Sequence, residues 1–516
     1  MNLCSSPSGE RCGCRQSGTG FSVSCRRSGN MSEQNNKLGV LSLAALVVGA
    51  MIGGGIFSLP QNMAQNASAC AVIIAWLVTG TGIFFLANTF RILSVARPDA
   101  TTGIYAYSAL GFGKFAGFQM AWAYWLSNIF GNVGYAVLLM DALDYFFPGV
   151  FTGGNNIWSI IGGSIVIWTM NYAVLRGVKQ AAFLNTVGTV CKLVPIFLFI
   201  IIVIAAFRYG LFVTDFTGKE TISTLGLKPL GSLSSQVRST MLVTLWAFIG
   251  IEGAVVVSGR ARSQKDVGRA TVLGFFCCLA IYAALSILPF GVMNQHELSQ
   301  LANPSTAPVL SAVVHGKWGG VVMNLGVIVA LLTSWLAFTI MVAQIPFAAA
   351  QDGTFPAIFK QENGNGSPSV SLWVTSLVMQ LALAMVFFAN NAWNTMLSVT
   401  SVMVLPPYLG CTLYLWKIAG KSDFPEQPGI GRKFALFCGI AGSLYAIWMI
   451  YAGGLKYLMM ALVFQLAGIP VFIAARKKSV QENESIMTEK EQYAAWLIAA
   501  AALLGIILFA AGKIKL

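Results

Sequence analysis

Two glycine-containing interruptions of apolar runs are the features of this sequence that most directly suggest chemistry. The segment Gly53–Gly55 has three successive glycines inside one run, and the segment Gly250–Gly253 has two glycines around Glu252 inside another. A glycine weakens a helix by about 1 kcal/mol relative to alanine. We therefore expect both helices to lose their regular hydrogen bonds at these points.

A broken helix presents the backbone groups that an amino acid needs. One half ends in unpaired C=O groups and the other begins with unpaired N–H groups, and the helix dipoles add matching partial charges. We predict that N–H groups at Gly54 and Gly55 hold a carboxylate and that nearby carbonyls accept an α-ammonium. The predicted backbone site consists of Met51, Gly53, Gly54, Gly55, Trp246 and Ile249.

The glycines also have a structural explanation, because glycines in membrane helices commonly let two helices approach closely. An isolated pair would favour that explanation. Three in a row, matched by a second interruption further along the chain, favour a binding loop instead.

Lys192 and Glu252 are ionisable residues inside apolar runs. A charge at the centre of a bilayer costs about 2.5–3.5 kcal/mol on insertion scales, so both are candidates for function. Lys192 is either a structural tether that donates to carbonyls freed by the broken first helix, or it stands where a sodium ion would sit in a sodium-driven relative. In the second case the loss of its charge is coupled to conformational change. Glu252 either serves a cationic substrate or proton coupling, or ties helices together as a neutral carboxyl. Trp246 and Trp335 either stack on a cationic side chain or pack against lipid and core.

The elements that position these residues must be transmembrane helices. Hydrophobic residues make up 56% of the chain and charged residues 10%, whereas soluble domains have roughly 25% charged residues. The apolar runs have the length of membrane helices, roughly 20 residues, and lack the short alternating segments of a barrel. We predict an all-α polytopic membrane protein with about thirteen spans, near 39–66, 71–95, 115–147, 156–175, 182–207, 237–259, 270–293, 319–349, 369–389, 393–418, 432–453, 456–475 and 492–512.

The two interruptions fall in the first and sixth predicted spans. Because they lie five spans apart, an odd number, the two halves have opposite topology, which is typical of inverted-repeat transporters with the substrate at the breaks. We predict a leader at 1–36, a ten-helix core at 37–420 and accessory helices 11 to 13 at 421–516. The leader is expected to be disordered and cytoplasmic, or else translation starts at Met31.

The net charge of +14 comes from Lys and Arg residues in the short connections between apolar runs. This distribution follows the positive-inside rule rather than forming a nucleic-acid-binding face. It predicts a multi-pass protein of the bacterial inner membrane with a cytoplasmic N-terminus. The residues on the predicted inner side are Arg91, Arg97, Lys114, Arg176, Lys179, Arg260, Arg262, Lys265, Arg269, Arg432, Lys433, Arg476, Lys477 and Lys478.

Enzyme chemistry finds little support in the sequence. The two histidines, His296 and His315, lie in one predicted exterior connection, and nucleotide-binding, hydrolase and zinc-protease motifs are missing. Six of the ten cysteines lie in or beside apolar runs, where they suit core packing. We therefore expect no cofactor and no metal site, and a homodimer is compatible with the sequence.

Three motifs together resemble the amino acid, polyamine and organocation transporter superfamily. They are the segments Gly53–Pro60, Trp246–Glu252 and Ala350–Pro356. Within that superfamily the chain is most similar to the basic amino acid/polyamine antiporters, in particular the arginine/ornithine antiporter and lysine permease group. The resemblance covers about residues 37–512.

The resemblance implies a five-plus-five inverted-repeat core and specific site residues. It implies that the distal cationic group of the substrate meets Ser127, Asn128, Asn132, Trp335 and Thr400. Trp246 would cover the substrate from outside, and Tyr124 and Tyr408 would form the inner gate. Glu252 matches the family's acidic residue linked to cationic substrates or pH, and Lys192 matches the lysine of the fifth span. The chain departs from arginine/agmatine exchangers at Ser127 and Asn128, where those proteins have smaller or less polar residues, and at Tyr135, where they have an aliphatic side chain.

Four functions compete on this sequence. The leading hypothesis is alternating-access exchange of arginine or lysine for ornithine or a diamine. The second is proton-coupled uptake of lysine or arginine, with Lys192 or Glu252 carrying the proton. A nutrient sensor would need a cytoplasmic partner domain, for which only residues 476–491 are available. A channel is disfavoured because a midplane site closed by Trp246 limits flow to one molecule per cycle.

Overall fold

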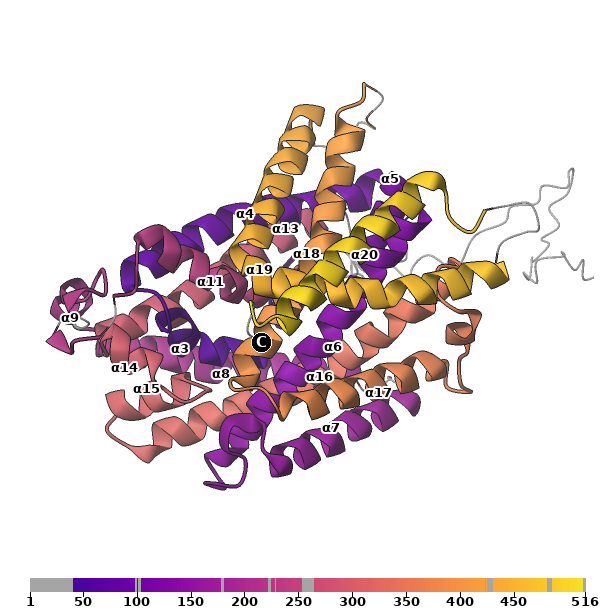
Figure 1. The fold of residues 1–516 in the computed structure, drawn as a ribbon. Coiled ribbons are helices and arrows are strands. Elements are labelled where there is room, and N and C mark those ends of the chain that lie inside the picture. The colour runs from indigo at the N-terminus through magenta and orange to yellow at the C-terminus, as the bar shows by residue number, and fades with distance from the viewer. Residues whose placement is uncertain are drawn as a thin grey trace, which may run out of the picture.

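The computed structural model describes residues 40–97, 100, 104–177, 181–220, 224–227, 229–252, 264–422, 424, 430–479 and 485–513. Their regular elements are helices, which confirms the predicted all-α class (Figure 1). The predicted leader lies outside the described residues. The longer helices are α2 (Val40–Met51), α4 (Ala69–Ala96), α6 (Lys114–Asp144), α7 (Ile157–Leu175), α8 (Ala181–Ala205), α11 (Leu233–Ala247), α13 (Gln264–Ile287), α16 (Lys317–Gln351), α17 (Ser369–Val386), α18 (Ala392–Ala419), α19 (Arg432–Ser479) and α20 (Glu489–Ala510).

Short helices connect or extend these long ones. The α-helical pieces are α3 (Leu59–Ala64), α5 (Ile104–Phe112), α9 (Tyr209–Thr214), α14 (Gln295–Ser299) and α15 (Thr306–Val313). The 3₁₀ pieces are η1 (Gly54–Ser58), η2 (Thr152–Gly154), η4 (Leu288–Gly291) and η5 (Ala357–Lys360).

Nine helices of the described residues are long and apolar enough to cross a membrane, and the bent pair at the first break makes a tenth. The predicted count of about thirteen stays a prediction. Helix α19 has 48 residues and a non-helical Gly454 with φ of 78°. Since one crossing needs roughly 20 residues, α19 is long enough for two of the predicted spans.

The packing of the helices repeats when each predicted span is exchanged with the one five places later. Helix α2 packs on α13 as α11 packs on α4, and α6 packs on α18 as α16 packs on α8. Helices at corresponding positions of the two halves also pack on each other, as α7 and α17 do side by side in Figure 1. This reciprocity is what two inverted halves produce.

The first predicted interruption is confirmed. Helix α2 ends at Met51, Gly53 is extended, and the chain resumes as η1 and then α3. The two halves meet at an angle of 56°. Pro60 lies in the first turn of α3, where its missing N–H costs no helical hydrogen bond.

The second predicted interruption is confirmed as far as Glu252. Helix α11 ends at Ala247, and residues 248–252 form a turn. Gly250 has a φ of 106° within this turn, a conformation that side chains with a Cβ strongly disfavour. Gly253 and the predicted continuation to residue 259 lie outside the described residues.

The accessory helices pack against the core, including α6, which carries Ser127, Asn128 and Asn132 of the predicted site. Helix α19 packs on α18 and α4, and α20 packs on α19. At the start of α20, the Glu491 carboxylate accepts a hydrogen bond of 2.9 Å from the N–H of Phe115, in the first turn of α6. A carboxylate at this position also complements the helix dipole of α6.

Candidate functional site at the two helix breaks

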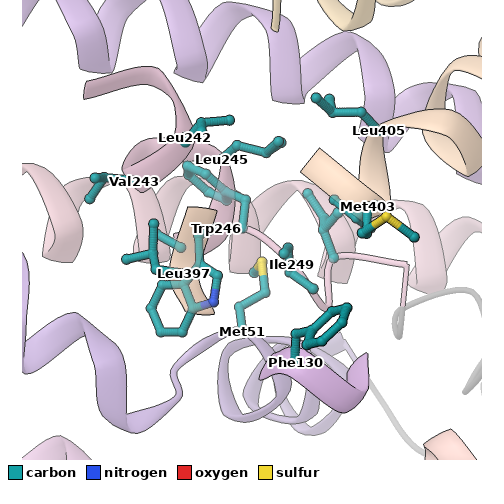
Figure 2. Close-up of a cluster of buried hydrophobic side chains, with 14 of the residues drawn as sticks. Met51, Phe130, Leu242, Val243, Leu245, Trp246, Ile249, Leu397, Met403 and Leu405 are labelled. Carbon is teal, nitrogen blue, oxygen red and sulfur yellow. The ribbon is translucent and has the colours of Figure 1, made fainter. Parts of the chain in front are cut away.

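A small enclosed cavity lies between the two breaks. Its walls come from the first break, α6, the end of α11, α16 and α18. Figure 2 shows Met51, Trp246 and Ile249 next to one another in this region. Seven of the predicted site residues line the cavity together with Gly131, Tyr135 and Phe338; the seven are Met51, Gly53, Asn128, Asn132, Trp246, Ile249 and Thr400.

The cavity has a volume of about 20 Å³, which is room for about one water molecule. Pockets for drug-sized ligands have volumes of roughly 300–1,000 Å³. An amino acid therefore enters this site only if the walls move apart.

Polar side chains in the cavity wall have unused hydrogen-bonding capacity. Asn132 Oδ1 and Thr400 Oγ1 are buried and have no hydrogen-bond partner among the described residues. Asn128 donates through Nδ2 to the Tyr124 carbonyl at 2.7 Å. Buried polar atoms in native proteins are nearly always paired, so such orphaned oxygens on a cavity wall mark places where a donor is expected to bind.

The backbone of the first break leaves its N–H groups available. Gly54 and Gly55 begin η1, so their N–H groups have no partner within that helix. No described residue accepts a hydrogen bond from either of them. On the other half, the Met51 carbonyl accepts bonds from the Tyr282 hydroxyl at 2.9 Å and from Gly53 N–H at 3.0 Å.

The backbone carbonyls predicted for an α-ammonium are thus partly engaged. Besides the two bonds to Met51, the Trp246 carbonyl accepts a bond of 3.2 Å from the Ile249 N–H. Each carbonyl has a second lone pair, but the Met51 oxygen has both occupied. The predicted ammonium contact at Met51 therefore requires one of its present donors to leave.

Glu252 lies at the sixth-span break, and both of its carboxylate oxygens accept hydrogen bonds. Oε1 accepts from the Tyr124 hydroxyl at 2.6 Å, and Oε2 accepts from the Tyr408 hydroxyl at 2.7 Å and from Gly250 N–H at 3.1 Å. Glu252 is 2% exposed. The carboxylate joins α6 and α18, one to two turns beyond the cavity toward their Lys114 and Lys417 ends.

Lys192 lies behind the first break rather than in the cavity. Its Nζ donates to the Gly49 carbonyl at 2.7 Å, and the side chain is 1% exposed. Gly49 is near the end of α2, where carbonyls lose their helical partners. This is the contact that the tether hypothesis predicts, whereas a role in charge coupling stays a prediction.

Aromatic rings form another part of the cavity wall. Trp246 packs edge-on against Trp393 at a centroid distance of 5.4 Å and against Tyr135 at 6.4 Å. A Cβ on Gly55 would overlap the rings of both tryptophans. Glycine at this position therefore allows the rings to seat directly on the backbone of the break.

Two predicted side-chain residues are buried but do not line the cavity. Ser127 donates to the Thr400 carbonyl at 2.7 Å and so joins α6 to α18. Trp335 is fully buried, and its Nε1 has no partner among the described residues. Both lie on the helices that form the wall, but neither faces the space that the structure encloses.

Sequence reasoning missed Trp393, Tyr282, Gly131 and Phe338. Trp393 and Tyr282 act through contacts with residues 147 and 231 positions away, and no local pattern marks such partners. The sequence marked Tyr135 only as a departure from arginine/agmatine exchangers. The structure places Tyr135 in the cavity wall.

Comparison with known proteins identifies the family of this chain. Residues 38–486 match the sequence profile of the amino acid permeases. The chain belongs to this family. It therefore falls within the superfamily that its motifs resemble, and it is a transport protein.

Several relatives of this permease match nearly their full length. A Clostridium perfringens protein, provisionally named as an amino-acid transporter, is 56% identical over 474 residues, which cover 92% of this chain and 98% of that protein. The arginine/agmatine antiporter of Chlamydia felis is 54% identical over 487 residues, with coverage of 94% and 99%. That of Chlamydia trachomatis is 53% identical over 479 residues, with coverage of 93% and 98%.

Family membership and the long apolar helices place this permease in a bacterial membrane as a multi-pass protein. The two confirmed helix breaks and the cavity between them agree with the family assignment.

Proposed function

We propose that this permease exchanges arginine for its decarboxylated product agmatine, or for a similar cationic amine, by alternating access. The observation that carries the proposal is the cavity between the two breaks, with the unpaired Asn132 Oδ1 and Thr400 Oγ1 in its wall. A guanidinium offers five N–H donors, which suit a wall of acceptor oxygens. The chlamydial relatives, which are named as arginine/agmatine antiporters, support the same substrate pair.

The cationic end of the substrate is the part that both exchange partners share. We assign it to Asn128, Asn132 and Thr400, with Trp246 stacking on its plane. Ser127 and Trp335 then support this wall from behind, because their side chains face neighbouring helices and not the cavity. Substitutions of Asn132 should consequently impair the transport of arginine and agmatine alike.

The carboxylate is the part that agmatine lacks. We assign it to the N–H groups of Gly54 and Gly55 at the start of η1, where the helix dipole adds partial positive charge. Arginine makes this carboxylate contact and agmatine does not. The site must therefore bind agmatine without any contact at Gly54 and Gly55. The α-ammonium is assigned to the end of α11, near Trp246 and Ile249.

Two closures separate the site from the two sides of the membrane in this proposal. Trp246 and Trp393 form the outer closure, and Glu252 with Tyr124 and Tyr408 forms the inner closure. The N-terminus is assigned to the cytoplasm on the positive-inside pattern, so the Lys114 and Lys417 ends face inward. The ten-helix core at 37–420 carries all of these residues.

Counterflow in proteoliposomes tests the exchange mechanism. Labelled arginine should enter vesicles loaded with agmatine or ornithine much faster than empty vesicles, because an empty carrier that cannot reorient needs a counter-substrate. Equal rates into loaded and empty vesicles would make obligatory exchange wrong.

Proton-coupled uptake of arginine or lysine is the second candidate, favoured by the buried Glu252 carboxylate at the sixth-span break. It predicts uptake into empty vesicles that follows an imposed proton gradient and stops when an ionophore collapses it. A panel of unlabelled arginine, lysine, ornithine and agmatine competing against labelled arginine then defines the substrate.

A further inference from the structure

A second hollow among the described residues is an outer vestibule, distinct from the cavity at the breaks. It has a volume of about 1150 Å³ and is lined by the end of α6, the starts of α16 and α18, and α15 with the segment before it. Trp393 lines its floor and also packs against Trp246, which lines the inner cavity. A substrate that reaches the cavity from this side must pass these two rings.

Two carboxylates at the end of α6 line this vestibule, and they are used differently. Asp144 caps the following loop, since its Oδ1 accepts from the Phe151 N–H at 2.8 Å and both oxygens lie near the Thr152 hydroxyl. Asp141 lies one turn deeper and lines the vestibule without a hydrogen bond to any described residue. Its carboxylate is therefore available to a ligand.

Asn324 on α16 supplies an independent second observation. It also lines the vestibule, is 1% exposed, and its Oδ1 has no partner among the described residues. Its Nδ2 is occupied, because it donates to the Gly320 carbonyl at 2.9 Å. A buried amide oxygen without a donor on a cavity wall calls for a ligand that donates hydrogen bonds.

The register of the two helices places Asp141 and Asn324 at the same depth. The Tyr145 hydroxyl donates to the Lys317 carbonyl at 2.9 Å, and a Cβ on Gly320 would lie against that hydroxyl. Helix α6 ends where α16 begins, so one turn inward leads from Tyr145 to Asp141 on α6 and from Gly320 to Asn324 on α16.

The charged groups around the vestibule favour a cation. Besides Asp141 and Asp144, the ionisable residues in its lining, apart from Tyr145, are Lys317 and His315. The Lys317 backbone lies at the level of Tyr145, one turn outside Asp141. The deeper part of the wall thus combines a carboxylate with an amide oxygen, a pair of acceptors that suits a guanidinium or a primary ammonium.

We infer that the vestibule is a loading site, in which Asp141 and Asn324 hold the cationic group of an incoming substrate before it passes Trp393 and Trp246. This inference rests on the proposed function, because it takes the substrate to be a cationic amino acid or amine. The loading site raises the local concentration of the substrate on the outer side, and its effect is therefore on KM for external substrate rather than on the maximal rate.

The test uses intact cells of a bacterial host without arginine carriers of its own, in which every copy of the full chain has the same orientation. Initial uptake of labelled arginine is measured against external concentration for wild type, Asp141→Asn and Asn324→Asp, at low and high ionic strength. We expect Asp141→Asn to raise KM about tenfold at low ionic strength with the maximal rate unchanged. Asn324→Asp should lower KM, and salt should shrink both effects.

Two further variants control for structure. Glu220→Gln removes an exposed carboxylate that does not line the vestibule and should keep the wild-type KM. Asp141→Glu keeps the charge and should restore most of the wild-type KM. An unchanged KM in Asp141→Asn, or a higher KM in Asn324→Asp, would overturn the loading site. If wild type takes up no arginine, lysine or agmatine, the proposed function fails instead.

Discussion

The two helix breaks are held by different chemistry. At the first break, fixed donors from neighbouring helices hold the end of α2, since Lys192 donates to the Gly49 carbonyl and Tyr282 to the Met51 carbonyl. At the second break, an ionisable side chain, Glu252, accepts from Tyr124 and Tyr408. The first arrangement satisfies backbone carbonyls that the broken helix leaves without helical partners. The second depends on side chains that can separate.

This difference indicates which break is the anchor and which is the switch. The donors at the first break fix the carbonyl half of the broken helix and leave the N–H half at Gly54 and Gly55 for a ligand. The Glu252 cluster instead joins α6 and α18 across the proposed inner closure, so opening that side means breaking its bonds. Hydrogen bonds to a buried charged group are worth about 1.5–3 kcal/mol each, which makes the cluster a substantial barrier.

Among the variants that test this comparison, Glu252→Gln should have the largest effect on arginine exchange. The amide carries no charge, so its hydrogen bonds to the two tyrosine hydroxyls are of the weaker neutral kind. Bonds weakened by about 3 kcal/mol in total destabilise the inner closure, so the carrier populates the inward-open state and rarely exposes its site outward. Arginine exchange should therefore fall about 100-fold. The measurement is exchange in proteoliposomes, with Glu220→Gln as the matched control. Wild-type exchange by Glu252→Gln would remove Glu252 from the switch.

Trp246→Ala should have the next largest effect. The ring covers the cavity, contacts Trp393 and is assigned to stack on the cationic group. Since a desolvated cation–π contact is worth about 1–2 kcal/mol, arginine exchange should fall about tenfold. Thermal unfolding in detergent should change little by comparison. A loss of folded protein as large as the loss of exchange would show that Trp246 is a packing residue.

Lys192→Met tests whether the first break is only an anchor. It removes the donor to Gly49 O, and an unsatisfied buried carbonyl costs about 1–3 kcal/mol, so the melting temperature should fall. Exchange measured per folded molecule should fall only a few-fold, because the Tyr282 hydroxyl still holds the end of α2. If the variant is as stable as wild type yet does not transport, the charge-coupling hypothesis replaces the tether.

Tyr135→Phe should have the smallest effect. The Tyr135 ring lines the cavity, and a Cβ on Gly53 would lie against its hydroxyl. Removing the hydroxyl keeps the ring contact with Trp246 and takes away one neutral donor, worth about 0.5–1.5 kcal/mol. We expect the ratio of arginine to agmatine transport to change about threefold, measured by competition. An unchanged ratio would exclude the hydroxyl from substrate selection.

Local features of the sequence predicted much of the fold and part of the site. Runs of apolar residues set the helices, because each span must satisfy its own backbone in lipid. Glycines at positions 53–55 and 250 set the breaks, because glycine destabilises a helix wherever it stands. The resemblance to a transporter superfamily then added Asn128, Asn132 and Thr400, which the structure brings to the cavity wall.

Tertiary structure alone decided which partners hold the breaks and how much space they enclose. Tyr124 and Tyr408 meet the Glu252 carboxylate across 128 and 156 residues of chain, and Trp393 meets Trp246 across a similar separation. The Asp141 and Asn324 pair likewise exists only because α6 and α16 pack in one register. Helix formation and helix breaking depend on neighbours within a few residues, whereas these contacts depend on how distant helices pack, which no local pattern encodes.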